Sequence, residues 1–248
     1  MNWTVLTLFP GSFRGGVLAE SILGRAVEAG LISVTAVNIR DFADPPHRVC
    51  DDAPYGGGPG MVMKPEPIVR AFRAEVEGKA DRVIALSAAG VPFSDRMARD
   101  LSALGHVCLI CGHYEGIDQR AIEAAGAQEV SIGNFLTSGG ETAALAVIDA
   151  VSRYVPGVIG KEESHSEESF TLPAGVLEYP HYTRPADFEG RIVPEVLRGG
   201  DHGAVRQWRL REAIVRTARR RPDILDEQKI LQSELADVYV QLRKEGVV

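Results

Sequence analysis

The stretch that decides the fold lies between residues 107 and 144. It reads VCLICGHYEGID, then a short helical segment, then EVSIGNFLTSGGETAA. Its two apolar runs, residues 107–111 and 129–132, are each followed by a turn that contains glycine. Apolar runs this short that end at glycine are typical of buried strands. We expect the two strands to be neighbours whose turns expose backbone N–H and C=O groups at one edge of a sheet. Open α/β sheets bind ligands at such an edge, so the stretch predicts a pocket.

Strand and helix patterns alternate on both sides of this stretch. Strands are predicted at residues 3–8, 33–39 and 82–87, and helices at residues 17–29, 65–78, 94–104, 117–125 and 141–153. We interpret SAAG, residues 87–90, as a third small-residue turn at the end of a strand. The alternation indicates an α/β fold with a mostly parallel, doubly wound sheet, and the periodicity by itself resembles a Rossmann-like sheet.

The pattern changes after residue 160, which predicts a second domain. Residues 1–160 form the first domain, residues 161–171 a polar linker that begins KEESHSEE, and residues 172–248 a small helical domain. Residues 172–194 are rich in proline and show little periodicity. Asp201 is a suitable cap for a helix over residues 203–220, and a last helix is predicted over residues 226–244.

The helical domain carries a run of arginines although the whole chain has a net charge of -7. Between residues 191 and 221 it has nine arginines and three acidic residues. Four of the arginines share one helical stripe: Arg206, Arg209, Arg216 and Arg220. A solvated helix face is the plain explanation, but arginine suits phosphate contacts, so we expect this domain to bind nucleic acid.

Residues 40–64 form a long segment without clear periodicity that includes DDAPYGGGPG. No Lys-Ser or Lys-Thr pair follows the glycines, so the segment is no Walker loop, and Pro59 interrupts any dinucleotide fingerprint. A structureless loop of this length inside a domain is usually functional or mobile. The residues themselves leave two interpretations equally open: a flexible surface loop, or a lid whose glycines let backbone approach a ligand.

Composition excludes several classes of protein. The 248 residues are 45% hydrophobic and 25% charged, as in ordinary soluble globular proteins. The start, MNWTVLTLFPG, lacks the basic region of a signal peptide, and no run reaches the roughly 20 apolar residues of a membrane span. Three cysteines suit a reducing cytoplasm. Cys108 and Cys111 are spaced as CxxC, but within a strand they point to opposite faces, so we expect core residues rather than a metal site.

The predicted pocket offers backbone groups and few fixed charges. Between residues 107 and 144 there is no metal-ligand cluster, no Ser/His/Asp arrangement and no lysine that could hold a phosphate. The nearby carboxylates are Glu115, Asp118 and Glu141. Such a pocket suits a small zwitterion with an adenine ring better than a triphosphate. These residues alone do not separate S-adenosylmethionine from ATP or NAD.

Five motifs together resemble those of the bacterial tRNA (guanine-37-N1)-methyltransferases, a family of the knotted SPOUT class. They follow the order of the family over most of the chain: DDAPYGGGPGMVM, CGHYEGID, SIGNFLTSGGE, SRYVPGVIG and PHYTRP. The resemblance implies a deep trefoil knot in the first domain and transfer of a methyl group from S-adenosylmethionine to N1 of guanosine 37 in the tRNA anticodon loop. It also implies a homodimer in the cytoplasm and dependence on Mg²⁺, for which the sequence presents no evident site.

The resemblance assigns S-adenosylmethionine to a set of residues in the strand-end turns. They are Leu86, Ser87, Gly112, Tyr114, Glu115, Gly116, Ser131, Ile132, Gly133, Asn134, Phe135, Leu136, Thr137, Gly139 and Gly140. Four positions depart from the family pattern: His113 stands where Arg is frequent, Phe135 for Tyr, Thr137 for Leu, and Ala143 for Pro. Phe135 keeps stacking area but lacks a hydroxyl group.

Methylation of guanine N1 requires a group that removes its proton, and a carboxylate can act as that general base. A cation near O6 can stabilise the charge that develops on the ring. By resemblance these roles fall on Glu168, as base, and Arg153. The family acid is typically Asp, so Glu168 is a departure, and Glu167 is its rival if the register shifts by one. A helix-end arginine and a solvated linker acid are the plain alternatives.

Three other functions remain open at this point. A SPOUT methyltransferase could act on ribose or on ribosomal RNA, and a non-catalytic RNA-binding protein could carry a vestigial pocket. The intact Arg153, Glu168 and glycine turns argue against the latter. An NAD-dependent oxidoreductase is disfavoured because the chain lacks GxGxxG and a ribose-binding acid after its first strand.

Overall fold

The structure is a computed structural model that describes residues 1–160 and 167–248. It divides into two compact units, the N-terminal unit of residues 1–160 and the C-terminal unit of residues 161–248. Each unit has a hydrophobic core of its own, and each is described here separately.

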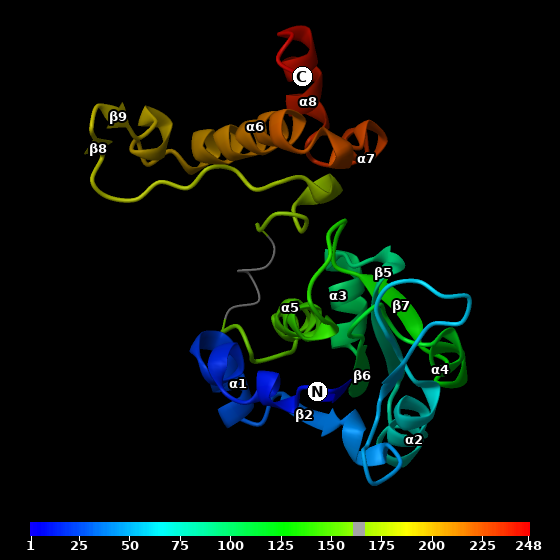
Figure 1. The fold of residues 1–248 in the computed structure, drawn as a ribbon. Helices are drawn as coiled ribbons and strands as arrows, with labels where there is room; N and C mark the ends of the chain where they lie inside the picture. Colours follow the sequence, from blue (N-terminus) through cyan, green and yellow to red (C-terminus); the bar gives the residue numbers. More distant parts are fainter. Residues whose placement is uncertain (161–166) are drawn as a thin grey trace. The chain divides into compact units, whose positions relative to one another are not determined.

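The N-terminal unit is built on a five-stranded sheet in the order β2-β1-β6-β5-β7 (Figure 1). Its strands are β1 (Asn2–Thr7), β2 (Ser33–Asn38), β5 (Arg82–Pro92), β6 (His106–Cys111) and β7 (Gln128–Ser131). All four neighbouring pairs are parallel. The predicted α/β fold with a mostly parallel sheet is therefore confirmed.

Helices cover both faces of this sheet, so it is doubly wound (Figure 1). One face packs against α1 (Ser21–Glu28), α3 (Asp95–Ser102) and α5 (Gly140–Ser152), and the other against α2 (Pro65–Glu75) and α4 (Gln119–Ala124).

Two cysteines of β6 show that both faces of the sheet are buried from solvent. Cys111 is buried in the core on the α5 side and Cys108 in the core on the α2 side, so the CxxC does not chelate one metal. Burial raises the pKa of the Cys108 thiol to about 12. Burial and the nearby Glu141 carboxylate raise the pKa of Cys111. Both thiols therefore stay protonated at neutral pH and are core residues.

Two predicted elements of this unit differ in the structure. The helix expected over residues 17–29 is a 3-10 turn, η2 (Gly16–Ala19), followed by α1, and the extended backbone of Glu20 (φ -121°, ψ 158°) separates them. The strand expected to end at Ser87 continues through residues 87–90 to Pro92, with a register shift against β7. A Cβ atom on Gly90 would lie 2.3 Å from the backbone nitrogen of Val130, so glycine permits this close pairing.

The long segment over residues 40–64 contains only short elements. A 3-10 turn, η3 (Ile39–Phe42), covers its start, and β3 (Asp51–Asp52) pairs antiparallel with β4 (Val62–Met63). The DDAPYGGGPG loop connects these two strands. One more 3-10 turn, η1 (Pro10–Phe13), follows β1.

The C-terminal unit is mostly helical in its second half. Its helices are α6 (His202–Arg220), α7 (Glu227–Leu231) and α8 (Ala236–Lys244), with 3-10 turns η5 (Pro173–Gly175), η6 (Glu195–Leu197) and η7 (Pro222–Ile224). The cap predicted at Asp201 is present, because its carboxylate accepts from the N–H groups of Gly203 and Ala204. Ile214, Ile230 and Leu242 are fully buried in the core of this unit.

The last helix was predicted as one element over residues 226–244, and this prediction is wrong. The Ser233 hydroxyl donates to the Ile230 carbonyl and accepts from the Leu235 N–H, so it replaces helical bonds between α7 and α8. No pattern in the sequence predicted the hairpin β8 (Asp187–Phe188) and β9 (Arg191–Ile192), whose strands have two residues each.

No helix in the described part of the chain is long and apolar enough to cross a membrane.

Removal of buried volume from α5 should destabilise the N-terminal unit. Ile148 is completely buried, so Ile148→Ala should lower the free energy of unfolding by about 2–5 kcal/mol. Val27→Ala on α1, where the side chain is 37% exposed, should change it by about 0.5 kcal/mol or less. Urea unfolding in a Trp208→Phe background, with Trp3 fluorescence as the signal of this unit, makes the measurement. Equal losses for the two variants would contradict the assigned core.

Candidate functional site

The cavity predicted from the glycine turns lies at the carboxyl ends of three strands. Leu86 of β5 is in register with Cys111 of β6 on one side and with Val130 of β7 on the other. The expectation that β6 and β7 are neighbours is therefore wrong, because β5 runs between them. The predicted pocket is nevertheless present, because the turns after β6 and β7 both line one cavity together with Leu86 of β5.

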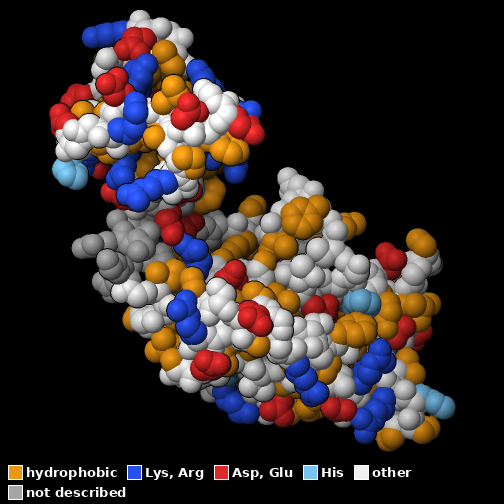
Figure 2. All heavy atoms as spheres, turned by 90° about the vertical axis from the view of Figure 1, so that its left-hand side faces the viewer, with side chains coloured by type: hydrophobic (Ala, Val, Ile, Leu, Met, Phe, Trp, Pro, Cys, Tyr) orange, Lys and Arg blue, Asp and Glu red, His pale blue; other side chains and the backbone are white. Residues whose placement is uncertain are grey.

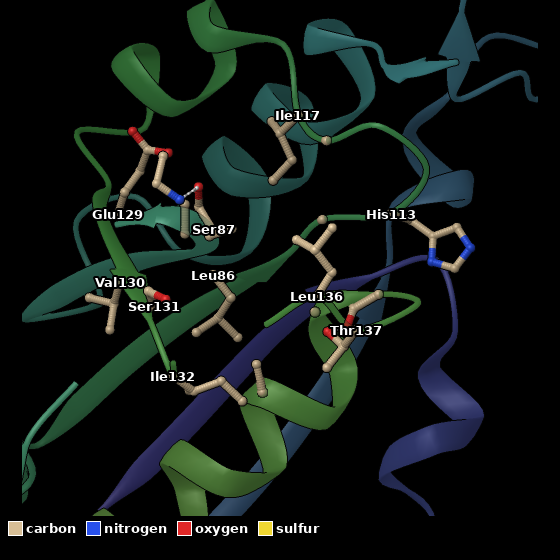
Figure 3. A pocket seen from close by; sticks show the side chains of 18 of the residues that line it. Leu86, Ser87, His113, Ile117, Glu129, Val130, Ser131, Ile132, Leu136 and Thr137 are labelled. Atoms are coloured by element: carbon tan, nitrogen blue, oxygen red, sulfur yellow. Dashed lines mark hydrogen bonds between the residues drawn. The ribbon is translucent and has the colours of Figure 1, made fainter. Parts of the chain in front are cut away.

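The cavity has a volume of about 390 Å³, within the range of roughly 300–1,000 Å³ of small-molecule sites. It is lined by every residue that the resemblance assigned to the cofactor except Asn134. Figure 3 shows the side chain of Leu86 in the middle of the pocket, with Ile132 on one side and Leu136 and Thr137 on another.

Several lining residues were missed in the sequence. They are Ala85, Ala88, Ala89, His113, Ile117, Gln119, Ile122, Glu129, Val130, Ser138 and Ala143. Ala88 and Ala89 belong to the small-residue segment after Leu86, so that segment was a signal for them. Ile117 and Ile122 have the pattern of core residues, and only the folded chain brings them to the pocket.

Gly140 fixes the distance between α5 and β6. A Cβ atom at this position would lie 2.7 Å from Cα of Cys111 and 3.0 Å from the backbone nitrogen of Gly112. The Gly140 N–H donates to the Gly112 carbonyl at 2.8 Å. Glycine is therefore required for helix–strand packing, and the loop that precedes α5 is held at the sheet edge.

The glycine-rich loop over residues 51–63 borders the turn after β6. The N–H of Glu115 donates to the carbonyl of Met61, and the N–H of Met63 donates to the carbonyl of Gly116, both at 2.9 Å. A Cβ atom on Gly60 would lie 2.2 Å from the Glu115 carboxylate. Because two backbone hydrogen bonds join the segments, the loop contributes to the architecture of the site.

Two of the three nearby carboxylates have structural partners. Glu141 accepts a hydrogen bond of 2.6 Å from the buried hydroxyl of Thr7. Asp118 caps α4 and pairs with Arg120, whose hydrogen bond lowers the pKa of Asp118. Glu115 and Glu129 both line the cavity.

His113 forms part of the aromatic rim of the cavity. Its ring lies 4.8 Å from those of Phe9 and Tyr114, measured between centroids. Its Nδ1 atom is buried without a partner among the described residues, and a bridge pairs its backbone with Gly139. The imidazole therefore has a free polar atom close to the ligand pocket.

The two predicted catalytic residues belong to different units. Arg153 is the C-cap of α5 in the N-terminal unit, is half-buried, and is not among the lining residues of the cavity. Glu168 belongs to the C-terminal unit, where its backbone is hydrogen-bonded to Thr171. The predicted linker over residues 161–171 falls partly outside the described residues, and its described part is bonded within the C-terminal unit.

Two arginines of the predicted stripe on α6 form ion pairs within the C-terminal unit. Arg206 pairs with Glu234, Arg209 with Glu167, and Arg211 of the same helix with Glu245. In the described part of the chain, Arg216, Arg219 and Arg220 form no ion pair. The face seen in Figure 2 accordingly shows basic side chains of this unit mixed with acidic ones.

Residues 1–160 and 167–248 contain no group of three or more His, Cys, Asp or Glu side chains that could hold a metal ion. No chemical step is assigned to the Mg²⁺ that the resemblance implied.

Known proteins similar to this chain agree with the geometry. The chain matches the family model described as tRNA (Guanine-1)-methyltransferase TrmD over residues 1–227. A relative named tRNA (guanine-N(1)-)-methyltransferase from Anaeromyxobacter sp. (strain Fw109-5) is 50% identical, over 93% of each chain. Relatives with the same name from Brevibacillus brevis and Dictyoglomus turgidum are 46% and 44% identical, over 99% and 97% of this chain and 99% and 96% of their own lengths. The chain therefore belongs to the tRNA (guanine-1)-methyltransferase TrmD family.

Proposed function

We propose that this chain transfers the methyl group of S-adenosylmethionine to N1 of guanosine 37 in the tRNA anticodon loop. Family membership supports the reaction on a tRNA guanine. The observation that carries the cofactor assignment is the cavity at the ends of β5, β6 and β7, because a glycine-rich backbone edge there leaves space for a small ligand.

The charges of this cavity favour S-adenosylmethionine over a nucleoside triphosphate. Among its described lining residues there is no Lys or Arg, whereas Glu115 and Glu129 are carboxylates. A triphosphate needs cationic partners, but a sulfonium ion gains from nearby acids. When bound, S-adenosylmethionine supplies a methyl group on that positively charged sulfur. The turns over residues 112–116 and 131–140 would hold it.

In this proposal Glu168 accepts the proton of guanine N1 and Arg153 stabilises the negative charge that develops on the base. Glu and Asp side chains have similar intrinsic acidity, which supports Glu168 in the place of the usual family Asp. The C-terminal unit would bind the tRNA with the basic residues near the end of α6, and the cytoplasm, where tRNA and free thiols occur, would be its compartment.

The proposal includes a deep trefoil knot and a homodimer. Family membership supports the knot. Apolar side chains exposed at the pocket support the dimer: Leu136 is 85% and Phe135 58% exposed. Large exposed apolar side chains that lie together are typical of protein interfaces.

The reaction is tested by incubation of the protein with labelled S-adenosylmethionine and unmodified tRNA transcripts, followed by mapping of the methylated nucleoside. We expect 1-methylguanosine at position 37. Label on ribose, on another base or only on ribosomal RNA would assign the chain to a different SPOUT activity. Tight tRNA binding without methylation would indicate a non-catalytic RNA-binding protein.

A methyl group on Gly140 should weaken cofactor binding. Gly140→Ala places a Cβ atom against the backbone of Cys111, so α5 and the loop before it must move away from the sheet edge. Calorimetry should show at least about tenfold weaker S-adenosylmethionine binding while circular dichroism reports a folded chain. Gly11→Ala, where no atom lies within 4 Å of the added carbon, is the control. Unchanged affinity in Gly140→Ala would place the cofactor elsewhere.

Loss of basicity at residue 168 should slow the chemical step. Glu168→Gln keeps the shape of the side chain, and turnover should fall on the order of a hundredfold with cofactor and tRNA affinities nearly unchanged. Glu168→Asp retains a carboxylate and should keep substantial activity. Single-turnover rates with enzyme in excess over tRNA make the comparison. A fully active Glu168→Gln enzyme would remove Glu168 from the role of base.

Neutralisation of the arginines near the end of α6 should weaken tRNA binding. The triple variant Arg216→Gln, Arg219→Gln and Arg220→Gln should reduce the slope of log affinity against log salt by roughly one for each phosphate that these side chains neutralise. Cofactor affinity should stay the same. Arg96→Gln, at an exposed position of α3, serves as the control for removal of a positive charge. An unaltered slope in the triple variant would mean that this helix end is only a solvated surface.

A further inference from the structure

Three residues of the C-terminal unit form a cluster beside Glu168, which we name the Glu167 clamp: Glu167, Tyr179 and Arg209. The hydroxyl of Tyr179 donates to Oε2 of Glu167 at 2.6 Å. Nη1 of Arg209 donates to the same oxygen at 3.2 Å. Because the three residues lie on separate segments of the chain, the clamp ties the segment before η5 to the extended segment before β8 and to α6.

The clamp is packed as well as hydrogen-bonded. The guanidinium carbon of Arg209 lies 4.7 Å from the centre of the Tyr179 ring. Tyr179 is only 6% exposed, and Nε of Arg209 is buried without a partner among the described residues. Burial, together with the hydrogen bond to Glu167, raises the pKa of Tyr179 to about 12. Tyr179 therefore remains a hydrogen-bond donor at neutral pH.

The backbone that follows the clamp is also fixed. The Glu168 carbonyl accepts from the Thr171 hydroxyl at 2.9 Å and from the Leu172 N–H at 3.1 Å. Leu172 is buried in the core of the C-terminal unit. The Ser169 hydroxyl accepts a hydrogen bond of 3.1 Å from the N–H of Glu178, which is the residue before Tyr179. Glu168 thus lies between two anchored points.

We propose that Tyr179 and Arg209 are positioning residues, which act by holding Glu167 so that the adjacent Glu168 is presented from the C-terminal unit in one orientation. The inference rests on the proposed role of Glu168 as general base. It gives Arg209 a different task from a tRNA phosphate contact, which the arginine stripe suggested in the sequence. It also assigns different roles to Glu167 and Glu168. The Glu167 carboxylate accepts hydrogen bonds from two donors, and Glu168 is the group that takes the proton.

Arg209 could position Glu167 or contact a tRNA phosphate, and Glu167 could position Glu168 or accept the proton itself. These alternatives predict different kinetics. A misplaced base lowers the rate of the chemical step, whereas removal of a phosphate-binding cation weakens tRNA binding and flattens its salt dependence. A positioning carboxylate can be replaced by an amide, because the amide oxygen still accepts from Tyr179. A proton-accepting carboxylate cannot be replaced in this way.

The experiment compares Glu167→Ala, Glu167→Gln and Tyr179→Phe in the full-length protein, with unmodified tRNA transcript and S-adenosylmethionine. Glu167→Ala and Tyr179→Phe should lower the saturated single-turnover rate about tenfold, with the Kd for tRNA and its salt slope unchanged. Glu167→Gln should stay near the parent rate. The matched control is Glu234→Ala. It removes the ion-pair partner of Arg206, which lies on α6 like Arg209, and it should leave the rate unchanged.

Three outcomes would overturn the inference. Glu167→Gln as slow as Glu167→Ala would make Glu167 a direct participant. If Glu167→Ala and Tyr179→Phe lowered only the affinity for tRNA, the cluster would instead have a role in RNA binding. An undiminished rate in both Glu167→Ala and Tyr179→Phe, with Glu168→Gln inactive, would show that Glu168 needs no clamp. The general-base proposal itself fails only if Glu168→Gln is active, so the two failures are distinguishable.

Discussion

The cavity depends on the contact between the start of α5 and the end of β6. At Gly140 the helix backbone approaches the Cys111–Gly112 turn so closely that a single Cβ atom does not fit, and a backbone hydrogen bond joins the two segments there. This contact holds the loop over residues 131–139 above the strand ends. A side chain at Gly140 would separate the sheet edge from the loop that closes it.

The site built around this contact has few charged groups, and two of its four nearby carboxylates have structural tasks. Glu141 is bonded to Thr7, and Asp118 to the start of α4 and to Arg120. The remaining polarity comes from backbone groups and from Glu115 and Glu129 at the lining. A pocket without a lysine or arginine among its described lining residues suits a ligand with a positive centre better than a phosphate, which agrees with the methyl donor we propose.

Several arginines of the C-terminal unit form ion pairs within the unit. Pairs with Glu167, Glu234 and Glu245 connect α6 to other segments of the unit. Exposed pairs of this kind contribute little stability individually, about 0–1 kcal/mol, but they fix the orientation of side chains. Arg216, Arg219 and Arg220, near the end of α6, form no ion pair among the described residues. A charge run in a sequence therefore overstates the surface available to RNA.

The sequence determined what depends on neighbours along the chain. It predicted the strands that end in glycine, the cap at Asp201, the opposite orientation of Cys108 and Cys111, and many of the residues that line the cavity. The tertiary structure alone decided that β5 runs between β6 and β7, that Ser233 divides the last helix, and that Arg209 pairs with Glu167. Turns and caps follow from local backbone and side-chain chemistry. Strand order and ion pairing follow from which distant segments the folded core brings into contact, and one-dimensional spacing does not encode that directly.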